Sequence, residues 1–102
     1  MSMEDAYAAA QNQLGVLEYC QTKGGVDDSV IATQTRLLGM IPTPEDTSDA
    51  VEAYAKGKAG TVASMGQEVT LADVAASRAT TEEGLCGQMA QLVQQADTQV
   101  PG

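Results

Sequence analysis

Apolar and polar positions recur along several separate stretches of the chain with the 3.6-residue period of an α-helix. From residue 3 to about 22, apolar side chains return every three or four residues and predict a first helix with one apolar stripe. The stripe consists of Tyr7, Ala10, Leu14, Leu17 and Cys20. Lys23 followed by two glycines is a typical end for such a helix.

Two more helices are predicted in the middle of the chain. The second is expected from about residue 27 to 40, with Val30, Leu37 and Ile41 on one side and Ile31 and Leu38 beside them. It should end at the sequence IPTP, because proline cannot continue a helix and restricts the residue before it. The third is expected from about 45 to 65, with Val51, Tyr54, Ala55, Val62 and Met65 facing inward. Gly57 and Gly60 each cost such a helix about 1 kcal/mol relative to alanine, but small residues also permit close helix contact.

The last third of the chain predicts two helices, each preceded by threonine. A short fourth helix is expected at about 71–78, where Thr70 and Asp73 fit the start signal of a Ser or Thr followed three residues later by an acid. A fifth is expected at about 81–97, where Thr80 and Glu83 fit a capping box. Its apolar residues are Leu85, Cys86, Met89, Leu92, Val93 and Ala96. No stretch has a convincing strand pattern. Residues 1–102 are therefore predicted to form one all-α domain, a small antiparallel bundle of four or five helices.

The two cysteines, Cys20 and Cys86, both fall on apolar helical stripes and should point toward a shared core. A disulfide between them would tie the first helix to the last and close a loop of about 66 residues, contributing roughly 4 kcal/mol. It would also imply an oxidising compartment. The chain shows no signal peptide, so this interpretation requires a mature exported form with Met1 added. The alternative is a pair of buried, reduced thiols in a cytosolic protein.

Composition narrows the possible functions. Fourteen acidic residues against five basic ones give a net charge of −9, which argues against nucleic-acid binding and against anionic membranes. No apolar run approaches the roughly 20 residues of a membrane-spanning helix. The chain contains no histidine, no phosphate-binding loop and no GxGxxG motif. Histidine-based catalysis and histidine-based zinc or copper sites are therefore excluded, and we expect a protein that is not an enzyme. A strongly acidic surface instead suits cationic partners or metal ions.

The most acidic segment is PTPEDTSDAVE, residues 42–52, with four carboxylates at Glu45, Asp46, Asp49 and Glu52. If a helix begins near Glu45, then Glu45, Asp49 and Glu52 share one face, with Asp46 on its flank. One interpretation is a site for a hard cation, because such ions prefer oxygen ligands. Four ligands would leave positions open to a second molecule, so a metal-bridged homodimer is a further expectation. The other interpretation is an ordinary acidic helix start, capped by Thr43 or Thr47.

Two other acidic pairs precede predicted helices. Asp27 and Asp28 open the second helix, and Glu82 and Glu83 open the fifth. Negative charge is favourable at a helix start, so we expect these pairs to be helix-start charges. Two helix starts that lie side by side in a bundle could nevertheless pool their acids into one cation site.

Four segments together resemble a known family. They are LEYCQ at 17–21, LLGMIPTPEDTS at 37–48, KGKAGTVASMG at 56–66 and TTEEGLC at 80–86. They look like a family of small, two-cysteine, periplasmic helical proteins of proteobacteria, often labelled pore-forming and likened to the mycobacterial early secreted antigens. The chain departs from those antigens because it has no tryptophan and hence no WxG turn, which puts pore formation in doubt.

The chain is also similar to the LanD-like periplasmic lanthanide-binding proteins of methylotrophic bacteria. That resemblance implies a periplasmic trafficking protein with a surface carboxylate site for a lanthanide such as La³⁺ or Nd³⁺, which two molecules can share through the metal. Ca²⁺ would then be a weaker substitute. The placement of the ligands at residues 45–52 comes from their spacing and not from the resemblance. The alternative function is a protein–protein interaction module or periplasmic stress chaperone, with a periplasmic protein partner and no metal site.

Overall fold

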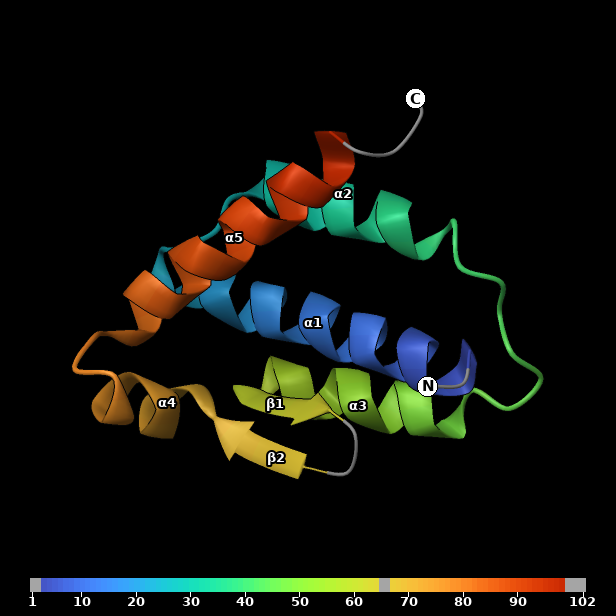
Figure 1. Cartoon of the computed structure of the whole chain (residues 1–102), viewed down its shortest axis with the longest axis horizontal. Coiled ribbons are helices and arrows are strands. Elements are labelled where there is room, and N and C mark those ends of the chain that lie inside the picture. Colours follow the sequence, from blue (N-terminus) through green and yellow to red (C-terminus); the bar gives the residue numbers. More distant parts are fainter. Residues whose placement is uncertain (1–2, 65–66, 99–102) are drawn as a thin grey trace.

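The computed structural model describes residues 3–64 and 67–98 of the chain, and these are mostly helical (Figure 1). The described residues form five helices and one two-stranded sheet. In chain order the elements are α1 (Met3–Lys23), α2 (Asp28–Leu38), α3 (Ser48–Lys58), β1 (Thr61–Ser64), β2 (Gln67–Thr70), α4 (Leu71–Ser77) and α5 (Glu82–Thr98). The predicted small helical bundle is therefore confirmed, with a short β-hairpin added to it.

The longest helix, α1, occupies the centre of the molecule. Helices α2 and α5 lie along one side of it, and α3 with the hairpin lies along the other (Figure 1). Helix α2 runs opposite to α1. Near the turn between them the side chain of Gln21 donates to Asp28, and further along α2 the side chain of Gln34 donates to the carbonyl oxygen of Ala10, earlier on α1, at 3.1 Å. Gln34 is buried, so its amide provides a hydrogen bond inside the α1–α2 contact.

Helix α3 runs in the same direction as α1, so this pair of helices departs from the predicted antiparallel arrangement. The contacts show this order, since Asn12 bonds to Ala53 whereas Tyr19, further along α1, lies against Gly60 beyond the end of α3. A parallel arrangement is possible because residues 39–47 form a long connection that carries the chain back to the start of α1 (Figure 1). This connection contains both prolines of the IPTP sequence, and α2 ends shortly before that sequence, at Leu38 with Gly39 as its C-cap.

The contact between α1 and α3 brings the two backbones together at glycines. A methyl group added to Gly57 would overlap the carbonyl oxygen of Asn12 and lie 2.7 Å from the backbone nitrogen of Val16. A methyl group added to Gly15 would overlap the carbonyl oxygen of Tyr54 in the same way. Gly15 and Gly57 are both buried. Only glycine fits at these two positions, so the close approach of α1 and α3 depends on them.

The same contact explains why the inward face of the third helix was predicted incorrectly. Val51 and Ala55 were expected to face the core, but both are exposed, Val51 by 66%. The buried residues of α3 are instead Ala50, Ala53 and Gly57. These three residues are small and recur at helical spacing. When two helices pack with their backbones in contact, the face with the smallest residues is buried, and the larger apolar residues are left outside.

The third helix is also shorter than predicted. It was expected over about 45–65, but it covers Ser48–Lys58 and is followed by Gly60, whose positive φ of 89° ends the helical path. The chain then forms β1, which pairs antiparallel with β2. The paired residues are Thr61 with Thr70, Val62 with Val69, Ala63 with Glu68, and Ser64 with Gln67. Val62 packs against the core as expected, while Met65 lies outside the described residues.

The amide of Asn12 holds the hairpin against α1. Its nitrogen donates to the carbonyl oxygens of Ala53 at 2.8 Å and Thr61 at 3.0 Å, and its oxygen accepts from the backbone N–H of Ala63 at 3.0 Å. Asn12 is only 3% exposed. One buried side chain therefore satisfies backbone groups of both α3 and β1, and it does so at the edge of β1 that β2 leaves open.

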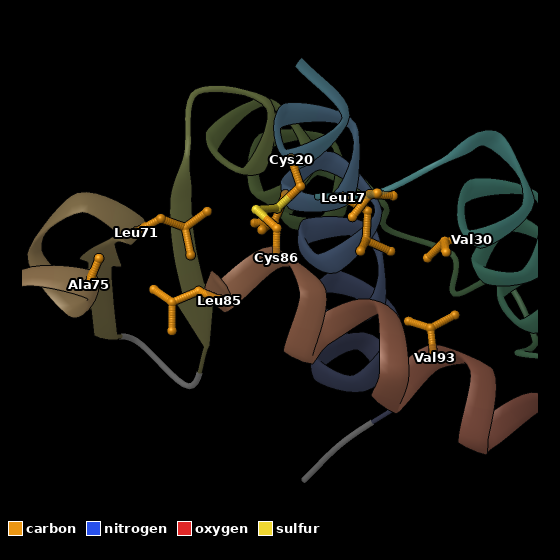
Figure 2. Packing of buried hydrophobic residues seen from close by; sticks show 10 residues of the cluster. Leu17, Cys20, Val30, Leu71, Ala75, Leu85, Cys86 and Val93 are labelled. Carbon is orange, nitrogen blue, oxygen red and sulfur yellow. A yellow bond between two sulfur atoms is a disulfide. The ribbon is translucent and has the colours of Figure 1, made fainter. Parts of the chain in front are cut away.

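The predicted disulfide is present and lies within the main core. Cys20 and Cys86 are fully buried and their sulfur atoms are bonded at 2.05 Å, which joins α1 to α5. Figure 2 shows the bond between Leu71 and Leu85 on one side and Leu17, Val30 and Val93 on the other. A cross-link that closes a loop of this length contributes about 4 kcal/mol on the chain-entropy model. That is a large share of the stability of a small domain.

The predicted helix starts are partly confirmed. The hydroxyl of Thr70 accepts from the backbone N–H of Asp73 at 3.1 Å, so Thr70 caps α4 as expected. The predicted capping box at Thr80 is wrong, because α5 begins at Glu82 and the hydroxyl of Thr81 accepts from the N–H of Gly84 at 3.0 Å. On α5, Leu92 was expected to face the core but is 61% exposed.

Replacing Gly57 with alanine should reduce the free energy of unfolding by about 1–3 kcal/mol, because the new methyl group forces α1 and α3 apart. The matched control is Gly87→Ala on α5, where an added methyl group meets no described atom within 4 Å. That control should leave stability unchanged or raise it by up to about 1 kcal/mol, since alanine is the better helix former. Urea denaturation followed by circular dichroism measures both, and equal stability of the two variants would contradict the proposed α1–α3 contact.

Candidate functional site

The four carboxylates predicted as metal ligands lie at the junction between the long connection and α3. Because α3 begins at Ser48, Glu45 and Asp46 precede the helix, and only Asp49 and Glu52 belong to it. The predicted helical face that starts at Glu45 is therefore wrong. All four side chains are exposed to solvent. Their assignment as ligands stays a prediction.

Asp46 provides the local hydrogen bonds at this helix start. Its Oδ1 accepts from the backbone N–H of Ser48 at 2.9 Å and from the Ser48 hydroxyl at 2.6 Å. These two bonds hold the pKa of Asp46 below its usual range, with the side-chain bond as the larger cause. Thr47, which occupies the cap position and was one predicted cap, makes no side-chain capping bond. The carboxylate of Asp46 thus makes the hydrogen bond at this helix start that was expected from the hydroxyl of Thr47.

Glu52 is paired with a lysine. The Nζ of Lys56 lies 3.2 Å from Glu52 one turn earlier on α3 and 2.9 Å from Glu68 on β2. Hydrogen bonds from Lys56 to Glu68 and then to Glu52 raise the pKa of the lysine. The ammonium group thus lies between carboxylates from two elements. A metal ion that uses Glu52 must compete with this internal cation.

No group of three or more Asp, Glu, Cys or His residues within 3–64 and 67–98 is arranged to hold a metal ion. The acidic residues of segment 45–52 are spread over an open surface, with no preformed cage around a common centre. Cation binding there would require the side chains to move together.

The starts of α2 and α5, which carry the other two acidic pairs, lie side by side. A methyl group added to Gly25, just before α2, would be 2.9 Å from the carbonyl oxygen of Glu83. Three of the four acidic side chains have structural partners, since Asp28 accepts from Gln21 and Glu82 accepts from Tyr19. Asp27 caps α2 by accepting from the N–H of Ser29 and of Val30, and the side-chain bond from Ser29 is the main cause that lowers its pKa. These residues therefore act as helix-start charges, as expected.

Two tyrosine–carboxylate pairs were not predicted from the sequence. The hydroxyl of Tyr19 on α1 donates to Glu82 on α5 at 2.5 Å, which raises the pKa of Tyr19. A hydrogen bond to Glu18 on α1 likewise raises the pKa of Tyr54 on α3. The Oε2 atom of Glu18 is buried and has no hydrogen-bond partner among the described residues. No motif could have revealed these pairs, because each joins residues from separate helices.

A small open cleft of about 200 Å³ lies between α1 and α3, next to the acidic segment. We call it the α1–α3 cleft. Its lining residues are Tyr7, Gln11, Thr47, Ala50, Val51 and Tyr54. The side-chain nitrogen of Gln11 donates to the hydroxyl of Tyr7 at 3.1 Å, one turn earlier on α1.

Comparison with protein-family profiles, with curated proteins and with solved structures finds no match. Within the described residues, no helix is both long enough and apolar enough to cross a membrane.

Replacing Ser48 with alanine should raise the pKa of Asp46 toward the usual aspartate value, because the hydroxyl bond to its carboxylate is lost. The wild-type carboxylate has a lowered pKa in the folded state. Its stabilising effect is therefore present above the ordinary aspartate pKa and disappears as the pH falls through the lowered value. The stability difference between wild type and variant should follow the same pH range.

NMR titration of the aspartate carboxyl carbons measures this shift. Ser29→Ala is the matched control, since it removes the equivalent bond to Asp27 and should leave Asp46 unchanged. An unaltered Asp46 titration in Ser48→Ala would show that the hydroxyl bond is not formed in solution.

Proposed function

We propose that the protein binds a hard cation of the lanthanide type, such as La³⁺ or Nd³⁺, through surface carboxylates, and serves metal trafficking rather than catalysis. The observation that carries this proposal is the run of four exposed carboxylates, Glu45, Asp46, Asp49 and Glu52, on a chain with a net charge of −9. Oxygen donors with full negative charge are the ligands that hard cations prefer, and a trivalent ion gains most from them. Ca²⁺ would bind at the same place more weakly, because it carries less charge.

The positions of these residues suggest how a site could assemble. Asp49 and Glu52 are three residues apart on α3, so they project from the same side of the helix. Glu45 and Asp46 lie in the connection before α3, where they can move toward the ion without unfolding a helix. Asp46 would have to share its carboxylate between the ion and Ser48. All four carboxylates are exposed, so metal binding breaks few buried contacts. It must, however, order several side chains.

The proposed location is the periplasm, or another oxidising compartment outside the cytoplasm. The support for it is the Cys20–Cys86 disulfide, since such bonds persist in oxidising compartments and are rare in the cytosol.

A terbium titration tests the proposed site. Tb³⁺ should bind in excess Ca²⁺ and give luminescence sensitised by a nearby tyrosine such as Tyr54. The double variant Asp49→Asn/Glu52→Gln should weaken binding by more than about tenfold. Lys56→Gln should strengthen it, because the ion no longer competes with the ammonium group for Glu52.

The matched control is Asp73→Asn/Glu83→Gln, which removes the same charge from exposed acids at the starts of α4 and α5. It should change Tb³⁺ binding by less than about twofold, as expected for distant charges that salt screens. Equal weakening by both double variants would mean that net charge, and not the segment 45–52, attracts the ion.

Four protein ligands leave coordination positions on a lanthanide open, so a second molecule could complete the shell. We therefore propose a metal-bridged homodimer. Two chains of charge −9 repel each other, and the ion would both join them and reduce that repulsion. Light scattering should show a monomer without metal and a dimer with La³⁺. A monomer that persists at high protein concentration with La³⁺ would remove the dimer from the proposal.

A second candidate function is a protein–protein interaction module or periplasmic stress chaperone without a metal site. The observation that favours it is the exposure of four large apolar side chains, Met40, Val51, Val69 and Leu92. The terbium titration separates the two candidates, because this second function predicts no preference for trivalent ions.

A further inference from the structure

The α1–α3 cleft has aromatic walls contributed by two helices. Tyr7 comes from α1 and Tyr54 from α3, and Ala50 and Val51 add apolar surface between them. Both phenol hydroxyls already have partners, since Tyr7 accepts from Gln11 and Tyr54 is bonded to Glu18. A ligand in the cleft would therefore meet mainly ring surfaces and apolar side chains, with the hydroxyl of Thr47, which makes no capping bond, beside them.

The charges around the cleft favour a cation. Glu4 lies three residues before Tyr7, on the same side of α1, and is exposed. Asp46 directly precedes Thr47, which lines the cleft. The whole chain carries a charge of −9. A negatively charged ligand would be repelled here, and a positively charged one would be attracted.

An ammonium group from the protein already contacts one of the two rings. The Nζ of Lys58 lies 5.5 Å from the centre of the Tyr54 ring, within the usual range of a cation–π interaction. Lys58 shows that the Tyr54 ring attracts an ammonium group, but its own positive charge opposes a second cation on that ring, so the acidic residues around the cleft must outweigh it. A metal ion would gain less there, because the cleft offers few oxygen donors and would not replace the ion's water shell.

The size of the cleft restricts the ligand further. Its volume of about 200 Å³ is below the roughly 300–1,000 Å³ of pockets that hold drug-sized molecules. It suits a compact group of a few heavy atoms, such as a methylated ammonium head.

We propose that the α1–α3 cleft binds the head group of a small, free alkylammonium compound, held between Tyr7 and Tyr54 and attracted by the acidic surface. Glu45, Asp49 and Glu52 do not line the cleft. Asp46 does not line the cleft either, but it adjoins Thr47 and so contributes charge to both proposed sites; the lining residues are distinct from the metal ligands, and either site could exist without the other.

Titration of ¹⁵N-labelled protein with tetramethylammonium chloride at constant ionic strength tests the proposal. Saturable shifts should appear for the amides of Tyr7, Gln11, Ala50, Val51 and Tyr54. The uncharged molecule of similar shape, tert-butanol, should bind at least about tenfold more weakly, because it lacks the cation–π attraction. NaCl at equal concentration should give no saturable shifts at these amides. Shifts that do not saturate, or that tert-butanol reproduces, would overturn the proposal.

Two matched variants separate a local effect from a general change in charge. Val51→Lys places an ammonium group at the cleft, whereas Val69→Lys adds the same charge on β2; both positions are exposed, by 66% and 48%. Val51→Lys should weaken tetramethylammonium binding by about tenfold or more, and Val69→Lys by less than about twofold, since salt screens the more distant charge. Equal effects would overturn the proposal.

Two further measurements test whether the cleft is independent of the acidic segment and which kind of ammonium group it takes. Binding should persist in Asp49→Asn/Glu52→Gln, so a failure of the metal proposal would not remove it; loss of binding in that variant would overturn the separate site. Nα-acetyl-lysine methylamide, which represents a lysine of a partner protein, should bind more weakly than tetramethylammonium. Tighter binding of the lysine compound would overturn the assignment to a free small molecule.

Discussion

The structure depends on the direct contact between the backbones of α1 and α3 at Gly15 and Gly57. No side chain separates the helices there, so the small residues of α3 face inward and Val51 faces solvent. The same closeness brings Ala53 and the first strand within reach of the Asn12 amide. The exposure of Val51 and the position of β1 against α1 therefore both follow from one close approach. The disulfide then fixes α5 to the other side of α1.

Acidic residues dominate the charge of the protein. Several acids have local partners that stabilise helix starts or join helices, as Asp27 and Glu82 do. The carboxylates at 45–52 are different, because four of them lie in one short exposed segment. The bonds of Asp46 to Ser48 and the ion pair of Glu52 with Lys56 offset only part of their negative charge. Such a surface attracts cations without presenting a finished site. An ion with three charges gains the most from gathering these side chains, which is the physical basis of the lanthanide proposal.

The two proposed cation sites differ in chemistry although they are neighbours. The carboxylate segment offers charged oxygen and suits an ion that exchanges its water shell for such ligands. The cleft between Tyr7 and Tyr54 offers ring surfaces and apolar contact, and suits a weakly hydrated ammonium group. The protein's own lysines make both kinds of contact. Lys58 lies against the ring of Tyr54, and Lys56 lies between the carboxylates of Glu52 and Glu68.

Local sequence determined where the helices lie, though not the ends of α3. It also determined the Thr70 cap and the apolar stripes that place Cys20 and Cys86 in the core, because periodicity and capping act over a few residues. The hairpin at 61–70 had no such signal, since strands of four residues are too short to show alternation. Which face of α3 is buried, and which acids lie near one another, was decided only by tertiary packing. At Gly15 and Gly57 the helices pack through close backbone contact, which favours small residues over large apolar ones. Carboxylates from separate elements come near one another only once the chain is folded.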